Sequence, residues 1–394
     1  MSSREPLPPL VKRLGWVSFF NDAAGELLYP VIPLFLTITL GAPVAVVGLV
    51  EGLADGVATG LKALAGYIAD RAREHRRMVQ FGYAIGAVAK PLIGLAPAWG
   101  FVAGLRVADR VGKAVRGVPR DLMITEAVPP GDRGRAFGFH RAMDSAGAVV
   151  GPLVAVAGVM LLGEGRLRPL FAVAVIPSAA ALLLLRRLPR TTRRSDKKWE
   201  PTPLPWRGPY GAFLVVTAVF SLVNSSDAFL LLRGKNLGLS VLQVILAYAI
   251  YNVLYTALSY PAGVRSDRVG RIALYGLGLV VFAVVYGGFA LAGSSAPVWP
   301  LLALYGVYMA FTDGIGRALV VDLVPADVRG KALGVHQAVT GACVLVAGVT
   351  AGILWETVSP RAPFALGAVG AILAAVLLVT TVRPPVGAAS ESTA

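Results

Sequence analysis

The sequence predicts an all-α integral membrane protein, with twelve transmembrane helices arranged as two six-helix parallel repeats. Its composition, the spacing of its apolar stretches and an internal duplication support this prediction. Of the 394 residues, 56% are hydrophobic and 15% are charged, whereas soluble domains contain about 25% charged residues. The apolar content excludes a disordered chain, and the single cysteine, Cys343, excludes a scaffold held by disulfides.

A transmembrane helix needs about 20 mostly apolar residues, and twelve stretches of the chain meet this need. Turn-forming residues separate several of them, as at Gly41-Ala42-Pro43. The first stretch is too long for a cleaved signal peptide, and it carries Asp22 and Glu26. The expected spans are residues 14–40, 45–69, 78–95, 101–119, 136–162, 169–185, 212–232, 242–264, 272–291, 298–324, 332–355 and 363–382.

The distribution of Lys and Arg predicts how the chain lies in the membrane. If the amino terminus is cytoplasmic, 25 of these residues fall in inside segments and 5 in outside segments. Because cytoplasmic loops are the richer in Lys and Arg, we expect a multi-pass protein of the inner (plasma) membrane with both termini in the cytoplasm. The net charge of +15 therefore reflects membrane topology, and we expect no nucleic-acid partner.

The two halves of the chain repeat each other. Residues 125–146 and 321–342 share nine identities at an offset of 196 residues, among them His140 with His336. A second match, at an offset of 197, pairs Asp70 with Asp267. Parallel repeats of this kind occur in transporters that rock two halves about a site near the membrane midplane. We expect an amino-terminal six-helix bundle over residues 1–187, a cytoplasmic basic linker over 188–208, and a carboxy-terminal six-helix bundle over 209–394.

One duplicated motif resembles that of the major facilitator superfamily. That family carries Gly-x-x-x-Asp-Arg-x-Gly-Arg between its second and third spans, and the second copy here matches it from Gly263 to Arg271. The first copy keeps the start of the motif but has Arg73 where the later glycine belongs. The resemblance implies the major facilitator fold, with this motif acting as a gate latch at the cytoplasmic face. The gate residues that we expect are Gly66, Asp70, Arg71, Gly263, Asp267, Arg268, Arg141 and Asp144.

Two further patterns resemble this family. Its fourth span often has an Arg followed six residues later by Gly, which Arg106 and Gly112 match. Its exporters often carry a glycine-rich fifth span that includes Gly-Pro, and this pattern is matched in part by Gly147, Gly151 and Pro152. We expect these last three residues to form a hinge.

Ionisable residues inside the expected spans concentrate in the amino half. A charge at the bilayer centre costs about 2.5–3.5 kcal/mol on insertion scales, so such residues face the protein interior and usually have partners. The carboxy half is poorer in such residues, so we expect it to present a more apolar wall to a substrate. The amino half holds six acids (Asp22, Glu26, Glu51, Asp55, Asp109, Asp144) and six bases (Lys62, Lys90, Arg106, Arg110, Lys113, Arg141), whose equal numbers suggest mutual pairing.

Four of these acids suit a proton carrier. Asp22 and Glu26 lie four residues apart on the first span, as do Glu51 and Asp55 on the second, so each pair shares a helix face. Crowded carboxylates in a low dielectric favour taking up a proton. Substrate-cation binding and fixed pairing with the fourth span are the alternatives.

The fourth span carries the expected substrate or ion network. Arg106 and Arg110 are like charges one turn apart, so they need acids on another span, whereas Asp109 can pair with Lys113 in its own helix. A fixed ion network is the alternative to one that is broken by a proton or a substrate. The network that we expect comprises Lys62, Arg106, Asp109, Arg110, Lys113 and Tyr29.

No motif for other chemistry is evident. The sequence lacks a phosphate-binding Gly-Lys-Ser/Thr loop, a cysteine pair and a His-x-x-x-His pattern. We therefore expect no enzyme, no catalytic residue, no resident metal and no cofactor. Without an ATP site, the energy for transport comes from a gradient.

The function that we predict is secondary active transport by alternating access. The leading hypothesis is a proton-coupled antiporter that exports a small organic compound. An importer of an organic anion attracted to Arg106, Arg110 or Lys62, and an exporter of a metal cation or a lipid-like amphiphile, remain alternatives. A non-transporting receptor is disfavoured because both gate copies are recognisable. The expected partners are a small-molecule substrate, protons and the lipid bilayer, and we expect a monomer.

Overall fold

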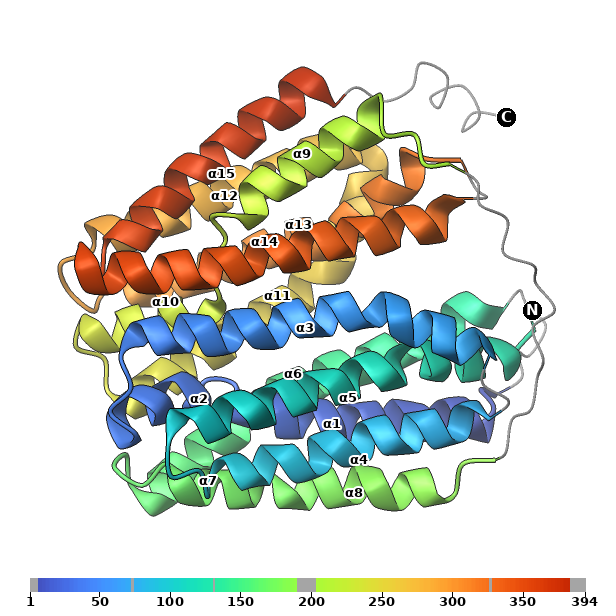
Figure 1. The fold of residues 1–394 in the computed structure, drawn as a ribbon, viewed down its shortest axis with the longest axis horizontal. Coiled ribbons are helices and arrows are strands. Elements are labelled where there is room, and N and C mark those ends of the chain that lie inside the picture. The colour runs from blue at the N-terminus through green and yellow to red at the C-terminus, as the bar shows by residue number, and fades with distance from the viewer. Residues whose placement is uncertain (1–5, 72–73, 130–131, 190–202, 326–327, 383–394) are drawn as a thin grey trace. The chain divides into compact units, whose positions relative to one another are not determined.

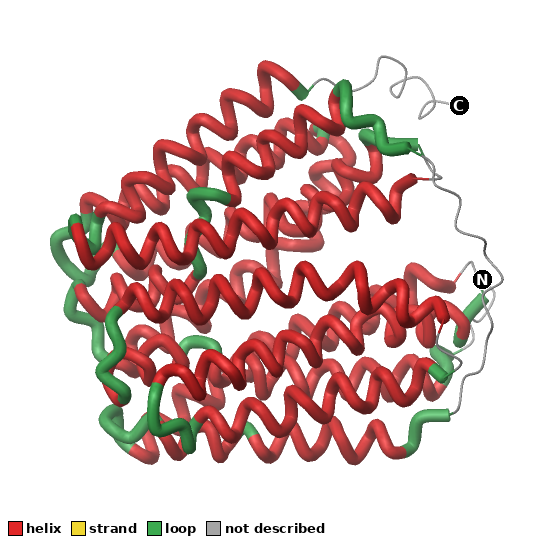
Figure 2. The backbone as a smooth tube through the Cα atoms, in the orientation of Figure 1, coloured by secondary structure: helices red, strands yellow, loops and turns green. Residues whose placement is uncertain are grey.

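The chain folds as helices joined by loops, and Figure 2 shows no strand in the part of the chain that the structure describes. This computed structural model describes residues 6–71, 74–129, 132–189, 203–325 and 328–382, without the side chains of 59–60, 62–71 and 134. The helices are α1 (Pro9–Leu28), α2 (Val31–Leu34), the π-helical η1 (Phe35–Thr39), α3 (Val44–Arg71), α4 (His75–Ile93), α5 (Trp99–Glu126), α6 (Arg133–Leu162), α7 (Arg168–Val173), α8 (Val175–Arg186), α9 (Pro209–Ser221), α10 (Asp227–Asn236), α11 (Val241–Val269), α12 (Arg271–Leu291), α13 (Val298–Asp322), α14 (Arg329–Thr357) and α15 (Ala362–Thr381).

Each expected span coincides with one helix or with a broken run of helices. Seven helical segments of the described chain are long and apolar enough to cross a membrane. The other expected spans are broken, as at Pro30, rich in charge, as on α5, or only partly described, as on α3, so the count of twelve stays a prediction. The seven segments are Arg135–Leu162, Arg168–Arg186, Val241–Val269, Arg271–Leu291, Val298–Asp322, Arg329–Thr357 and Ala362–Thr381.

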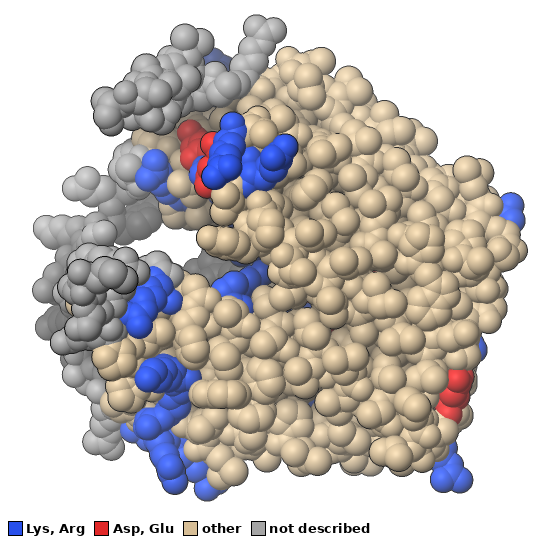
Figure 3. Space-filling model, turned by 180° about the vertical axis from the view of Figure 1, so that it is seen from behind, with Lys and Arg blue, Asp and Glu red and all other residues tan. Residues whose placement is uncertain are grey.

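The surface between the helix ends is apolar. On the face shown in Figure 3, Lys and Arg side chains gather near the ends of the molecule, and the broad surface between them is almost free of charge. Leu161, Leu291 and Val379 are more than two thirds exposed. In water such exposure would be unfavourable, but against lipid tails it is not.

The chain divides into two compact units whose segments interleave. Unit 1 comprises Met1–Pro43, Leu53–Lys197 and Ser240–Ala249, and unit 2 comprises Val44–Gly52, Lys198–Leu239 and Ile250–Ala394. The first turns of α3 thus belong to unit 2, and those of α11 belong to unit 1. The expected linker, residues 188–208, lies partly outside the described residues.

The same helix neighbours recur in the two units. In unit 1, α1 packs on α6 and α8, and α4 packs on α5 and α8 (Figure 1). In unit 2, α9 packs on α14 and α15, and α12 packs on α13 and α15. These pairs correspond one to one under the sequence repeat, so both halves of the sequence build one scaffold.

Two glycines of α6 allow its backbone to touch that of α1. A Cβ atom at Gly147 would lie 2.4 Å from the carbonyl oxygen of Phe19, and one at Gly151 would lie 2.6 Å from that of Ala23. Small residues permit such close approach between helices in membranes. Pro152 lies inside α6 directly after this contact. The hinge that we expect at these three residues stays a prediction.

Two glutamates bind the first N–H groups of the helices that run through both units. In unit 1, Val241 at the start of α11 donates its N–H to Glu164 Oε2 at 2.9 Å. In unit 2, Val44 at the start of α3 donates its N–H to Glu356 Oε1 at 2.7 Å. The first N–H groups of a helix have no partner within it, and the positive end of its dipole favours a carboxylate. Each glutamate therefore anchors the start of one long helix.

Two arginines bind the opposite kind of helix end. Arg168 donates to the carbonyl oxygens of Gly94 and Ala96 at 2.8 and 3.1 Å, just after α4 ends. Arg233 donates to the carbonyl of Ala292 at 2.8 Å, just after α12 ends. Cations suit helix carboxyl ends, where carbonyls lack partners.

Replacing Gly151 by Ala should lower the temperature at which the purified protein unfolds in detergent. The added methyl group would overlap the backbone of α1, and overpacking of this kind costs about 1–3 kcal/mol. On the same helix, a Cβ atom at Gly138 would meet nothing within 4 Å. Gly138→Ala should therefore leave the unfolding temperature unchanged or raise it, because Ala favours a helix over Gly. An equal loss in both variants would contradict the close-contact explanation.

Removing the glutamate at the start of α3 should loosen its first turn. In Glu356→Ala the N–H groups at Val44 should exchange with deuterium faster, whereas Glu356→Gln keeps an acceptor oxygen and should show a smaller increase. Hydrogen exchange read by mass spectrometry on peptides that cover the start of α3 measures the change. The start of α11, bound by Glu164, serves as the internal control, and an equal rise there would contradict a local effect.

Candidate functional site

A buried ion pair joins α4 and α5 inside unit 1. Lys90 Nζ lies 3.3 Å from Asp109 Oδ1, and each side chain is only 8% exposed. The same Nζ donates to Asn21 Oδ1 at 3.1 Å, and Asn21 Nδ2 donates to Asp22 Oδ1 at 3.0 Å. The expected pairing of Asp109 with Lys113 is replaced by this ion pair, because Lys90 approaches from the neighbouring helix and Lys113 is exposed. The pair and Asn21 thus connect three helices through polar contacts.

A second ion pair in unit 1 is more open. Arg110 Nε of α5 lies 3.1 Å from Asp55 Oδ1 of α3, and the Asp55 side chain is 38% exposed. This contact joins Asp55, one of the expected proton-coupling acids, to Arg110, a base of the expected substrate or ion network. The side chain of Lys62, further along α3, lies outside the described residues. Glu51, one turn before Asp55, is buried and belongs to unit 2.

Glu26 and Tyr29 of the first span meet the start of α11. Tyr248 donates its hydroxyl to Glu26 Oε2 at 2.6 Å, and its ring stacks on that of Tyr29 with centroids 5.4 Å apart. Arg106 Cζ lies 6.0 Å from the centroid of the Tyr29 ring, within the range of a cation–π contact. Tyr29 therefore lies between a base of α5 and a tyrosine of α11, all within unit 1.

The histidines of the repeat both lie beside the first helix of their half, His140 through Asp144 and His336 directly. His140 Nδ1 lies 3.6 Å from Asp144 Oδ2, and Ser18 of α1 donates to the other oxygen of that carboxylate. His336 stacks on Phe213 of α9 with ring centroids 5.7 Å apart. Asp144 thus ties α6 to α1, whereas Arg141 is exposed.

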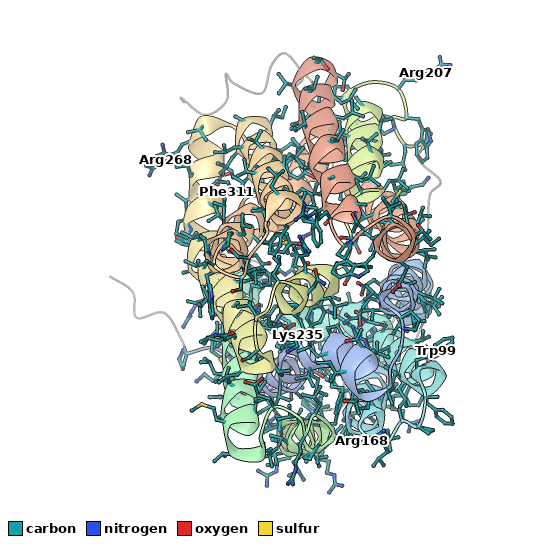
Figure 4. The ribbon with its side chains drawn as sticks, turned by 90° about the vertical axis from the view of Figure 1, so that its left-hand side faces the viewer. Trp99, Arg168, Arg207, Lys235, Arg268 and Phe311 are labelled. Carbon is teal, nitrogen blue, oxygen red and sulfur yellow. The ribbon has the colours of Figure 1, made fainter. Side chains whose placement is uncertain are left out.

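The second copy of the gate motif is an ion cluster between three helix ends. Arg271, at the start of α12, donates to Asp267 Oδ1 of α11 at 3.0 Å and also to Asp322 at the end of α13. Arg268 projects away from the helices (Figure 4) and is exposed. The sequence analysis does not predict that Asp322 binds Arg271. A signal for it exists, because another acid, Glu126, stands at the corresponding position of the first repeat. In the first copy, the side chains of Gly66, Asp70 and Arg71 lie outside the described residues.

Unit 2 holds a polar cluster where an apolar wall is expected. Asp227, the first residue of α10, accepts hydrogen bonds from the hydroxyls of Tyr305 at 2.7 Å and Tyr251 at 3.3 Å. Tyr286 donates to the carbonyl of Ser225 at 3.2 Å, and Asn224 Nδ2 donates to Tyr308 at 3.4 Å. The expectation that this half presents a more apolar wall stays a prediction, but at this place tyrosine hydroxyls bind a carboxylate.

The cluster in unit 2 occupies repeat positions that carry the ion pair in unit 1. At the offset of 196 residues, Tyr286 corresponds to Lys90 and Tyr305 corresponds to Asp109. The structure supports this register, since Gly82 lies against Arg116 and Gly278 lies against Thr312, also at that offset. One half therefore has an ion pair where the other has two tyrosines.

The comparisons with known proteins agree with this architecture. The family model of the Major Facilitator Superfamily matches residues 14–232 and 212–394. An uncharacterized MFS-type transporter of Methanocaldococcus jannaschii is 32% identical over 378 residues, which cover 93% of each chain. The vesicular acetylcholine transporter of Rattus norvegicus is 29% identical over 190 residues, 47% of this chain and 36% of that one. The crystal structure of a nucleoside transporter superposes with a TM-score of 0.78 at 15% identity, covering 94% of this chain and 99% of the other. With both halves matched in turn and a relative aligned over nearly its whole length, the chain belongs to the major facilitator superfamily and is a multi-pass membrane transporter.

Proposed function

We propose that the protein is a proton-coupled antiporter that exports a small organic compound by alternating access. Membership of the superfamily establishes transport, and the direction, the proton and the cargo are the proposal. The ion pair between Asp55 and Arg110 carries it. A carboxylate and an arginine attract each other while both are charged, and a proton that neutralises the carboxylate removes this attraction. Alternating between these two states would couple one proton to one conformational step.

Exposure distinguishes this pair from the other one in unit 1. Lys90 and Asp109 are each 8% exposed, whereas Asp55 is 38% exposed. A proton has to reach a carrier from water, so a buried pair suits a fixed structural role and an open pair suits a carrier. Asp22 and Glu26 remain candidates as carriers, since their contacts to Asn21 and Tyr248 are hydrogen bonds to neutral groups. Glu51 is buried, so it is a less favoured candidate for the proton carrier.

Export is supported by the partial glycine-proline pattern at Gly147, Gly151 and Pro152, and by the concentration of carboxylates within the expected spans of the amino half. The matching transporter of rat is named for acetylcholine, which is a small organic compound. Import of an organic anion is the second candidate, because Arg106 beside Tyr29 offers a cation and a ring. Metal-cation and lipid-like cargoes are further alternatives. We also propose that the protein is a monomer of the inner membrane with both termini in the cytoplasm.

Replacing Asp55 by Asn should abolish transport driven by a pH gradient but leave exchange without a gradient intact. Proteoliposomes with an imposed pH gradient are assayed with labelled ethidium, uridine and benzoate, and the probe that wild type concentrates is then used for the variants. The amide cannot carry a proton, so accumulation should fall to the level without a gradient. Asp121→Asn, which removes an exposed carboxylate beside Arg120, is the control.

Two results would overturn parts of this proposal. If wild type moves every probe equally with and without the gradient, proton coupling is wrong. If Asp55→Asn keeps the full gradient-driven accumulation, the carrier is another residue, and Asp22→Asn and Glu26→Gln are tested in the same assay.

Loss of the gate cluster should shift the population between the inward-open and outward-open states. Arg271 holds Asp267 and Asp322 together. Asp267→Asn should therefore raise the labelling rate of single cysteines near one membrane face and lower it near the other, on a Cys343→Ser background. Asp70→Asn should act in the same direction. Arg265→Gln changes an exposed charge of the same helix that is not one of the expected gate residues, and it should have little effect. Unchanged labelling in Asp267→Asn would refute the latch.

A further inference from the structure

The break in the seventh expected span places a carboxylate among tyrosine rings. Residues 222–226 separate α9 from α10, and Asp227 follows them directly. Non-helical backbone at membrane depth is tolerated where it is buried in protein or lines a water-filled path, and transporter sites are often built at such breaks. The Asp227 carboxylate is held there by two hydroxyls, those of Tyr305 and Tyr251.

Four tyrosine rings of α11 and α13 form a connected group beside this carboxylate. The ring centroids of Tyr251 and Tyr305 are 5.3 Å apart, and those of Tyr305 and Tyr308 are 5.1 Å apart. Tyr255 stacks on Tyr251 with centroids 6.4 Å apart. The faces of aromatic rings, including those of Tyr, are electron-rich and attract cations. We call Asp227 and these four tyrosines the tyrosine cluster.

An acceptor with no donor lies at the same break. The Oδ1 atom of Asn224 is buried and has no hydrogen-bond partner among the described residues, although the Nδ2 atom of the same amide donates to Tyr308. A buried acceptor without a donor is unfavourable unless a ligand supplies one. The ligand that suits this place is a cation that carries N–H donors, because a carboxylate and ring faces attract positive charge and the amide oxygen accepts a hydrogen bond.

Parts of the tyrosine cluster are accessible. Asp227, Asn224 and Tyr255 are each half-buried, whereas Tyr251, Tyr305 and Tyr308 are buried. A ligand would therefore meet the carboxylate and the ring of Tyr255 first, and the buried rings would form the floor.

The carboxylate is not part of the duplicated scaffold. At the offset of 196 residues, α10 begins at Asp227 and α2 begins at Val31. The helix break is thus repeated in both halves, while the charge is present in one half alone. A charge that the scaffold does not need in its other copy favours a role in binding over a role in folding.

We propose that the tyrosine cluster binds the ammonium group of an organic cation, which is the cargo of the transporter. This inference rests on the proposed function, since it names the chemical class of the exported compound. The Asp227 carboxylate would neutralise the ammonium charge, the Asn224 amide oxygen would accept one of its N–H groups, and the tyrosine rings would enclose its substituents.

Binding is tested on the purified full-length protein with benzylamine and with benzyltrimethylammonium, which has no N–H group. Benzyl alcohol and benzoate are the neutral and anionic counterparts of similar size. Isothermal titration should show both ammonium compounds binding, benzylamine the tighter, and the two counterparts binding at least tenfold more weakly. In Asn224→Leu, benzylamine should no longer bind more tightly than benzyltrimethylammonium.

A set of variants separates the contribution of the carboxylate charge from that of the tyrosine rings. Asp227→Asn still accepts hydrogen bonds from Tyr305 and Tyr251 but lacks the charge, and it should weaken ammonium binding at least tenfold. Tyr308→Leu removes a ring and should weaken it several-fold, whereas Tyr308→Phe keeps the ring and should change it little. Asp121→Asn serves as the matched carboxylate control, and the unfolding temperature of each variant shows that the fold is retained.

The inference would be overturned if wild type and Asp227→Asn bound the ammonium compounds with equal affinity. It would also be overturned if wild type bound benzoate as tightly as benzylamine. The proposed function is tested apart from this. If proteoliposomes concentrate uridine or benzoate under a pH gradient and neither ammonium compound is moved, the cation site is wrong and proton-coupled transport stands. If no compound responds to the gradient, the proposed function itself fails.

Discussion

The scarcity of water inside a membrane governs the polar groups of this protein. A charged or hydrogen-bonding side chain that leaves water must find its partner within the protein, or its burial costs several kilocalories per mole. Lys90 meets this requirement by contacting Asp109 and Asn21 at once, which ties α4 to α5 and α1. Asp227 meets it through two tyrosine hydroxyls. In each unit, the same contacts that satisfy a polar group also fix which helices are neighbours.

Those parts of the fold that follow from repeated chemistry could be predicted from the sequence. Apolar runs, short basic loops and the 196-residue offset predict the helices and the duplicated neighbours. The positions of Asp55 and Arg110 on adjacent expected spans also predict that an acid and a base can meet. What the sequence could not supply is the rotation of each helix about its own axis. Asp109 therefore pairs with Lys90 on the next helix, although Lys113 stands at the ideal spacing on its own helix.

Two other features could not be predicted from the sequence, for different reasons. Tyrosine is apolar in a composition count and polar at its tip, so the hydrogen bonds from Tyr251 and Tyr305 to Asp227 cannot be predicted before their hydroxyls are placed. The exchange of Val44–Gly52 and Ser240–Ala249 between the units depends on contacts at the start of two long helices. Each of these helices corresponds to one continuous expected span, so nothing in its pattern marks where it passes from one unit to the other. The two halves thus share a backbone plan and differ in the polarity built on it, with ions at Lys90 and Asp109 and phenols at Tyr286 and Tyr305.

The seam between α1 and α6 has a mechanical consequence. At Gly147 and Gly151 the two helices touch through main-chain atoms, so no side-chain rotamers lie between them to absorb a displacement. A shift of a fraction of an ångström toward each other produces a steric overlap, and a shift apart loses the packing contacts between the two helices. The two helices therefore resist being moved apart at this contact. If α6 bends at the expected hinge, α1 has to follow it, and Glu26 on one helix and Asp144 on the other keep nearly the same separation.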